Sequence, residues 1–135
     1  MSTPDLSLEA ASSFLRAAGL TFDEITGGRV TGTLATGSDQ HTPWGVVHGG
    51  VYTTAVESAC SVGASTAVLE RGQFAVGLAN HTDFIRPHRE GELRVEARAI
   101  QQGQTQQLWE CDITRPDGKL VARGQLRLQN VELPT

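Results

Sequence analysis

The residue in this 135-residue sequence whose surroundings most favour chemistry is Glu57. It is the only charged side chain between Val51 and Leu69, a stretch of small, apolar and hydroxylic residues. A carboxylate is costly to bury unless it is paired, hydrogen-bonded or protonated, and positions of this kind often perform acid, base or nucleophilic chemistry. Two structural alternatives remain open: Glu57 could point to the surface, or it could pair with an arginine.

A His48-Gly49-Gly50 triplet begins the same stretch. Glycines at a helix start leave backbone N–H groups uncovered at the positive end of the helix dipole, where a developing oxyanion would be stabilised. The same glycines would equally allow a helix start to pack closely against a neighbour. Ser61 lies one helical turn after Glu57 and could hold a water with it, although Ser61 could also be a small packing residue.

Other catalytic classes are disfavoured by the spacing of the reactive residues. The sequence contains no HExxH pattern and no GxSxG elbow, which argues against a zinc hydrolase and against a Ser-His-Asp hydrolase. Cys60 lies off the Glu57 direction on a helical wheel and is expected in the core. We therefore expect neither a metal nor a redox cofactor. The histidines are scattered along the chain at His41, His48, His81 and His88.

The composition indicates one globular domain over residues 1–135. The sequence is 39% hydrophobic, with 15 acidic and 11 basic residues and a formal net charge of -4. An acidic chain without a basic stripe is a poor nucleic-acid binder. No apolar run is long enough for a membrane helix, and Cys60 and Cys111 lack metal-ligand spacing, so we expect a protein of the reducing cytoplasm.

The elements that must position these residues can be read from periodicity. Residues 1–19 are expected to form an N-terminal helical segment, with a helix from about 6 to 18 that is capped by Asp5 or Ser7 and ends at Gly19. Two strands, 20–26 and 29–36, should form a hairpin around the glycine pair at 27–28.

The remaining elements are one long helix and four strands. The helix is expected over 49–69; it is apolar on nearly every face and should be wrapped by other elements. Strands are expected at 74–85, 93–100, 106–114 and 120–131, joined by turns at Gly91, at 102–103 and at 115–118, so that consecutive strands pair as antiparallel neighbours. The predicted fold class is α+β, an antiparallel sheet curled around a long central α-helix, with a short N-terminal helix.

Together these residues resemble the hot-dog fold acyl-CoA thioesterases. The resemblance rests on the His48-Gly49-Gly50 helix start, on Glu57 nine residues after the histidine, and on the run Asn80-His81-Thr82-Asp83-Phe84-Ile85-Arg86-Pro87 followed by Gly91. It extends from about Leu20 to Val131. Within the family the chain is most similar to the phenylacetate-pathway-type (PaaI-like) and 4-hydroxybenzoyl-CoA thioesterases with a glutamate on the central helix.

The resemblance implies a role for each matching position of the helix. Glu57 falls on the family's acid, which acts as nucleophile or as general base for water. Gly49 falls on the backbone N–H that polarises the thioester carbonyl, with Gly50 beside it. Ser61 falls on the water-orienting hydroxyl, and His48 on the histidine that lines the thioester or pantetheine site.

The resemblance also implies substrate contacts outside the helix. Arg86 and the Gln104-Thr105 turn fall on positions that contact the phosphates and nucleotide of coenzyme A, although a surface arginine and simple turn residues would explain them equally. Asn80 and His81 would face the acyl pocket or the partner subunit, or would form a satisfied pair at a strand interface.

One departure from the family pattern concerns the thioester carbonyl. Six residues before the histidine the family usually has Gln or Asn, and this chain has Thr42, with Gln40 and His41 nearby. A threonine hydroxyl donates a hydrogen bond over a shorter reach than an amide. The second contact to the carbonyl is therefore in question.

The helix geometry predicts a site shared between two chains. Gly49 and Glu57 lie eight residues apart, about 12 Å by the rise per residue, which is too far for both to contact one thioester carbon. The resemblance likewise implies homodimers that pair through the strand holding Val76 to Phe84, with two sites per dimer. Such dimers often pair again into homotetramers.

The leading hypothesis is hydrolysis of an aryl- or medium-chain acyl-CoA to the free acid and CoA. The alternative is a non-catalytic acyl-CoA sensor or binding subunit, for which Thr42 is the best support. A hydratase on the same fold would need an Asp-His dyad near the helix start, and that motif is absent. Acyl specificity depends on pocket depth, which the sequence pattern leaves open.

Overall fold

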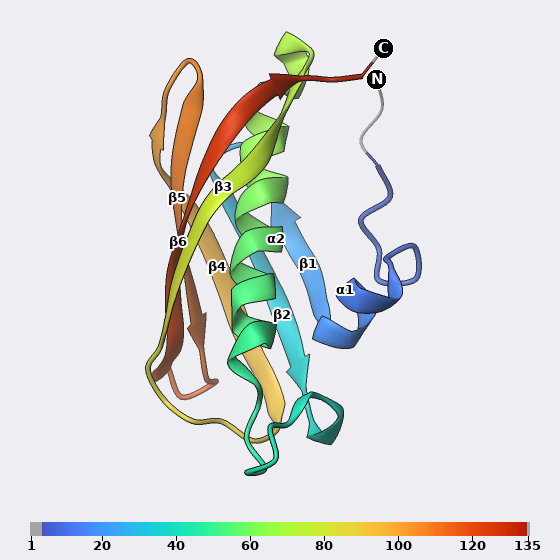
Figure 1. Cartoon of the computed structure of the whole chain (residues 1–135), viewed down its shortest axis with the longest axis vertical. Helices are drawn as coiled ribbons and strands as arrows, with labels where there is room; N and C mark the ends of the chain where they lie inside the picture. The colour runs from blue at the N-terminus through green and yellow to red at the C-terminus, as the bar shows by residue number, and fades with distance from the viewer. Residues whose placement is uncertain (1–3, 135) are drawn as a thin grey trace.

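The computed structural model of the chain describes residues 4–134, in which one six-stranded antiparallel sheet curls around one long helix, α2 (Figure 1). The predicted α+β architecture is confirmed. Two short 3₁₀ turns, Ser38–Gln40 and Leu69–Arg71, flank α2 on its two sides in the chain. The elements are α1 (Ser13–Ala18), β1 (Leu20–Ile25), β2 (Arg29–Thr36), α2 (Gly49–Val68), β3 (Gln73–Phe84), β4 (Gly91–Gln102), β5 (Gln106–Thr114) and β6 (Leu120–Glu132).

The strand order is β1-β2-β4-β5-β6-β3, which corrects one prediction. The turn at Gly91 was expected to make β3 and β4 hairpin neighbours, but β3 pairs with β6 and β4 with β2. The six residues 85–90 form an extended crossing instead of a tight turn. The N–H groups of Ile85 and Arg86 donate to the Val121 carbonyl, and the His88 carbonyl accepts from Val47 N–H, so the chain crosses to the other half of the sheet.

The N-terminal helix is shorter than predicted. It begins at Ser13, with Ser12 as its N-cap, because the Ser12 hydroxyl accepts from Leu15 N–H at 3.3 Å. The Ser7 hydroxyl likewise accepts from Ala10 N–H, and the residues between form turns. Serine side chains that bond to nearby backbone groups compete with helix formation. The predicted caps at Asp5 and Ser7 are therefore wrong, whereas the predicted stop at Gly19 is confirmed by its left-handed φ of 81°.

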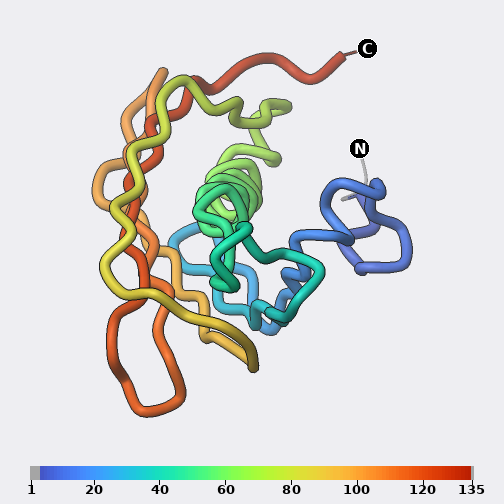
Figure 2. The backbone as a smooth tube through the Cα atoms, turned by 60° about the horizontal axis from the view of Figure 1, so that its bottom comes forward, coloured from blue at the N-terminus to red at the C-terminus, as the bar shows by residue number. Residues whose placement is uncertain are grey.

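One side of α2 packs on the concave face of the sheet, as Figure 2 shows looking nearly along the helix. Its sheet-facing residues are mostly small, which lets the sheet approach closely. The opposite side faces the N-terminal segment and is partly open. The expectation that α2 is wrapped on nearly every face is therefore wrong for its outer side. The buried residues of α2 are Tyr52, Ala55, Val56, Ala59, Cys60, Gly63, Ala64 and Val68.

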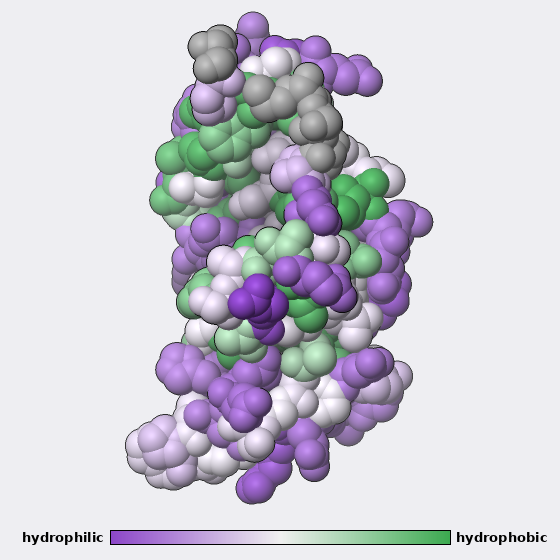
Figure 3. All heavy atoms as spheres, turned by 90° about the vertical axis from the view of Figure 1, so that its right-hand side faces the viewer, coloured by the Kyte–Doolittle hydropathy of each residue, from purple (hydrophilic) through white to green (hydrophobic). Residues whose placement is uncertain are grey.

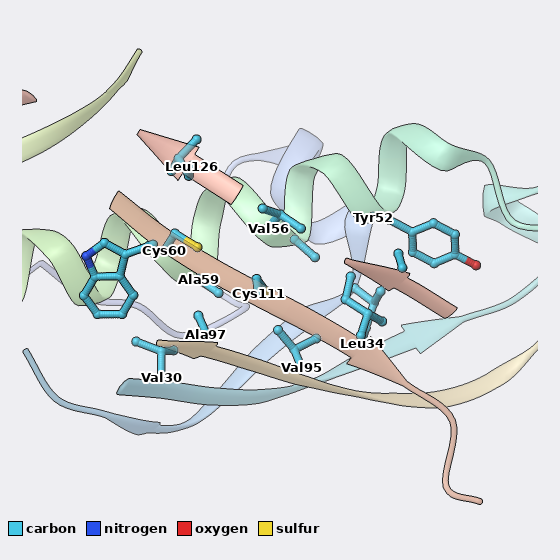
Figure 4. Close-up of a cluster of buried hydrophobic side chains, with 14 of the residues drawn as sticks. Val30, Leu34, Tyr52, Val56, Ala59, Cys60, Val95, Ala97, Cys111 and Leu126 are labelled. Atoms are coloured by element: carbon cyan, nitrogen blue, oxygen red, sulfur yellow. The ribbon is translucent and has the colours of Figure 1, made fainter. Parts of the chain in front are cut away.

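The core between α2 and the sheet includes Cys60 of α2 and Val30 of β2 (Figure 4). It also contains Trp109, which is fully buried. Its indole N–H donates to Gln107 Oε1, and the Gln107 amide donates to the Ala64 carbonyl at 3.0 Å and to Asn130 at 2.8 Å. These bonds satisfy the buried polar groups and tie α2 to the sheet. Cys60 is buried, as predicted, and within residues 4–134 no helix is both long and apolar enough to cross a membrane.

Gly63 should be essential for this close packing. A Cβ at position 63 would lie 2.4 Å from the Trp109 ring and 2.9 Å from Val30. We expect Gly63→Ala to lower the free energy of unfolding by about 1–3 kcal/mol through overpacking, despite the better helix propensity of alanine. Urea titration followed by circular dichroism measures the change. Gly28→Ala, where a Cβ meets nothing within 4 Å, is the matched control and should be nearly neutral.

Candidate active site

The start of α2 is organised by His48, its N-cap residue. His48 Nδ1 accepts from the Gly50 N–H at 2.8 Å, and the His48 carbonyl accepts from the Val51 N–H. An accepting Nδ1 places the proton of the neutral imidazole on Nε2, whose N–H then points outward as a donor. Among residues 4–134 no acceptor bonds the Gly49 N–H. The Gly49 N–H is therefore the first backbone donor of α2 that is free to bind a ligand.

Gly49 packs directly on an aromatic ring from the edge strand β3. A Cβ at position 49 would lie 2.4 Å from the Phe84 ring, so only glycine fits without moving that ring. Phe84 also contacts Tyr52, with ring centroids 6.1 Å apart, and it stays 58% exposed. The aromatic pair therefore fixes the position of the helix start relative to β3 and leaves one side of Phe84 open to a ligand.

Glu57 is exposed at the open side of α2. Of the alternatives that the sequence left open, the surface position is therefore confirmed for the single chain, and the expectation of a buried carboxylate is wrong. The Glu57 carboxylate lies beside Gly77 of β3, 3.7 Å from where a Cβ would stand. It also lines a cavity of about 450 Å³ together with Ser58 and Ser61. The predicted shared face of Glu57 and Ser61 is thus confirmed, and both groups are accessible to water.

Asn80 and His81 have different environments. The Asn80 amide donates to the Thr53 carbonyl at 3.0 Å and accepts from the Thr82 hydroxyl at 2.7 Å, so it ties β3 to α2. His81 points outward, with 83% of its side chain exposed, and its Nε2 lies 3.4 Å from Asp83. Asn80 supports the helix that carries Glu57, and His81 is available to a neighbouring molecule.

The loop before the helix shows which polar group could reach a carbonyl. The Gln40 amide donates to three backbone carbonyls, those of Ala17, Ala18 and Ala35, and is fully used. His41 Nε2 lies 2.7 Å from the Arg89 carbonyl. The Thr42 hydroxyl accepts from Trp44 N–H and keeps its own proton to donate. Thr42 therefore still has a donor to offer, unlike Gln40.

Within one chain, the residues expected to contact coenzyme A lie beside opposite ends of strand β6. Arg86 donates to the Leu120 carbonyl at the start of β6, whereas the Gln104 and Thr105 carbonyls bond Asn130 near its end. Ten strand residues separate these points, about 33 Å by the strand rise. One chain therefore does not bring Arg86 and the 104–105 turn together.

Two features of the site were not anticipated from the sequence. Residues 5–15 form one wall of the cavity at Glu57, and Trp44 is 82% exposed at the tip of the loop before α2. The helical spacing of the Leu and Ala residues in 6–15 predicts a helix, which hid their role as a wall. The described residues contain no cluster of three or more His, Cys, Asp or Glu side chains that could hold a metal ion.

Comparison with known proteins was made for sequence and for structure. Residues 45–122 match the family described as Thioesterase superfamily. The chain is similar to a Mycobacterium tuberculosis protein whose name assigns it provisionally to the esterases, with 43% identity over 90 residues. That match covers 65% of this chain and 64% of the relative, so the chain spans less than two thirds of the relative's length. The solved structure of the M. tuberculosis protein superposes with a TM-score of 0.87 and 36% identity, covering 92% of this chain and 100% of that one.

Two further relatives have informative names. A Pseudomonas aeruginosa protein, also named provisionally as an esterase, is 30% identical over 134 residues, which cover 97% of this chain and 92% of the relative. The 1,4-dihydroxy-2-naphthoyl-CoA hydrolase of Escherichia coli is 30% identical over 105 residues, which cover 78% of this chain and 76% of the relative.

The buried hydroxyl of Tyr52 gives a pH prediction. Burial raises the pKa of Tyr52 from 10.0 to about 12, and among residues 4–134 its hydroxyl has no hydrogen-bond partner. The unfolded chain loses this proton near pH 10, so the stability linked to it is complete below pH 10 and is lost as the pH rises through about 12. We expect this loss to be about 1–3 kcal/mol larger for the wild type than for Tyr52→Phe in urea titrations at rising pH. Equal pH dependence of the two proteins would show that the hydroxyl is solvated.

Proposed function

This chain belongs to the Thioesterase superfamily, and on that premise we propose that it hydrolyses an acyl-CoA thioester to the free acid and CoA. The hot-dog fold is the one found in the similar solved structures. A relative named as a CoA thioester hydrolase, 30% identical, supports coenzyme A as the leaving group. We place the chain in the PaaI-like branch, because Glu57 lies on the central helix nine residues after His48.

The observation that carries the proposal is the pairing of a free helix-start N–H with an accessible carboxylate on one helix. The Gly49 N–H lacks an acceptor among residues 4–134 and stands at the positive end of α2, where it would stabilise an oxyanion. Glu57 faces a cavity with Ser61 beside it. These are the two functions that thioester hydrolysis needs: a polarised carbonyl and a base or nucleophile.

The reaction follows from these positions. Glu57 takes a proton from water, the resulting hydroxide adds to the thioester carbonyl carbon, and the oxyanion accepts from the Gly49 N–H. The C–S bond then breaks, the carboxylic acid is released and the CoA thiolate receives the proton. In the alternative course, the Glu57 carboxylate attacks the carbonyl carbon, the C–S bond breaks and the CoA thiolate leaves, and water then hydrolyses the anhydride to the free acid and Glu57, supplying the proton that the thiolate takes up. Ser61 orients the water, and the Thr42 hydroxyl and His48 Nε2–H are the further donors near the carbonyl.

Both groups can act on one carbonyl only if two chains share the site. Because α2 is one continuous helix, Gly49 and Glu57 stay about 12 Å apart within a chain. Gly49 packs on Phe84 and Glu57 beside Gly77, on the same strand β3. Within residues 4–134, β3 has β6 on one side and no strand on the other. It is therefore free to pair with a second copy.

An antiparallel β3–β3 pairing centred on His81 would complete the site. Phe84 and Gly77 pair with Ala122 and Leu128 of β6, and His81 pairs with Gln125, midway between them. A two-fold axis at His81 therefore places Gly77 opposite Phe84 of the partner subunit, and Glu57 beside Gly49 of the partner subunit. The same pairing brings Arg86 and the partner's 104–105 turn to one end of the dimer. One coenzyme A could then contact both.

A second candidate is an acyl-CoA-binding protein without turnover. The observation that favours it is the Thr42 hydroxyl, which stands where the family usually has an amide and already accepts from Trp44 N–H. Such a protein would retain the pocket and the Gly49 N–H, and its Glu57 would be dispensable.

Replacing Glu57 separates the two candidates. We expect Glu57→Gln to fold normally, since Glu57 is exposed, and to lose at least about 100-fold in turnover, since an amide is neither base nor nucleophile. CoA release from benzoyl-CoA and hexanoyl-CoA is followed with a thiol reagent. Glu70→Gln, at an exposed carboxylate beyond the end of α2, is the matched control and should keep wild-type rates. CoA release by Glu57→Gln near the wild-type rate would remove Glu57 from the mechanism.

A further inference from the structure

The N-terminal segment, residues 4–15, lies opposite the outer side of α2 (Figure 1). Figure 3 views the molecule from this side and shows hydrophobic residues, in green, among hydrophilic ones. Between the segment and α2 are two cavities, of about 450 and 470 Å³. Both cavities are lined by Leu6, Ser61 and Val62, so they adjoin along the helix. Glu57 lies in the first and not in the second. The path therefore runs from the carboxylate toward the C-terminal end of α2.

The second cavity has apolar walls. Leu69, Phe74 and Leu133 line it together with Leu6 and Val62, and none of the described residues that line it carries a charged side chain. Two of its hydroxyl groups are used within the chain: the Ser65 hydroxyl accepts from Ala75 N–H at 3.0 Å, and the Thr66 hydroxyl donates to the Val62 carbonyl at 2.7 Å. The third, that of Ser61, lies at the junction with the first cavity. A polar ligand would therefore find few partners there, whereas a hydrocarbon would lose none.

We propose that the N-terminal segment and α2 enclose the aliphatic tail of the acyl group, and that this segment sets the preferred chain length. The inference rests on the proposed function, since it takes the thioester to lie at Glu57. From Glu57 to Leu69 the helix rises about 18 Å, enough for an extended unbranched chain. Each cavity has the volume of a small-molecule site. The substrate class is thereby narrowed to acyl-CoAs with a linear aliphatic tail.

The segment is built to admit such a tail. Outside α1 it is held by single-turn hydrogen bonds, such as Ala10 N–H to the Ser7 carbonyl and Ala11 N–H to the Leu8 carbonyl, both at 3.2 Å. Exposed turns of this kind open at low free-energy cost. The segment also lies outside residues 45–122, the part of the chain that matches the family.

Binding of non-hydrolysable CoA thioethers tests the proposal without turnover. We expect the wild type to bind S-dodecyl-CoA at least about 30-fold more tightly than S-butyl-CoA by calorimetry, because each buried methylene adds to affinity. Val62→Trp fills the junction of the two cavities, and Leu6→Asp places a charge in both. Each should reduce this preference to about threefold or less while S-butyl-CoA binding changes by less than about threefold.

The controls separate the possible outcomes. Ile100→Trp, at a half-exposed position on β4, should keep the wild-type preference. Leu6→Asp changes a surface segment and keeps the test valid if Val62→Trp does not fold. An unchanged preference in the folded variants, or no preference in the wild type, overturns the proposal. A molecular mass of Leu6→Asp or Val62→Trp that differs from that of the wild type by light scattering also overturns it, because the cavities would then be covered by a second copy. A wild type that shows the preference but releases no CoA from dodecanoyl-CoA would retain the tail site and refute hydrolysis.

Discussion

The fixed spacing of Gly49 and Glu57 along α2 is the constraint on which the rest of the account depends. A helix rises about 1.5 Å per residue, so two groups eight residues apart cannot move toward one another without breaking the helix. Here the helix is held on its inner side by Trp109 against Gly63 and by the Gln107 amide on the Ala64 carbonyl. The scaffold that presents both groups therefore also keeps them apart, and a second chain has to close the gap.

The edge strand β3 provides the means of closing it. Phe84 supports the helix start, Asn80 bonds the Thr53 carbonyl, and Gly77 leaves room for the Glu57 carboxylate. One strand thus contacts α2 at both functional positions, and its outer side is unpaired within residues 4–134. Unpaired strand edges are templates for pairing with another chain. Assembly and catalysis would therefore depend on the same backbone hydrogen bonds.

The sequence predicted local elements better than long-range neighbours. The strands at 29–36 and 106–114 were placed to the residue, because alternation and turn chemistry are local. The pairing of β3 with β6 was missed, because the 85–90 crossing depends on bonds to Val121 and Val47 that no local pattern encodes. Glu57 was found from its isolation among uncharged residues, but its exposure was not, since one sequence cannot show which side of a helix a sheet leaves open.

The most direct test of the shared site is activity of a mixed dimer. One subunit carries Glu57→Gln and the other Gly49→Pro, which removes the N–H at the first position of the helix, where the backbone accepts proline. The proline Cβ also displaces the Phe84 ring, so this substitution inactivates the Gly49 half of the site in both respects. The two chains carry different tags, and the heterodimer is purified through both. If each site takes Gly49 from one chain and Glu57 from the other, the heterodimer has one intact site and regains about half the wild-type rate of CoA release, while both homodimers stay inactive. A heterodimer as inactive as the homodimers would contradict the account.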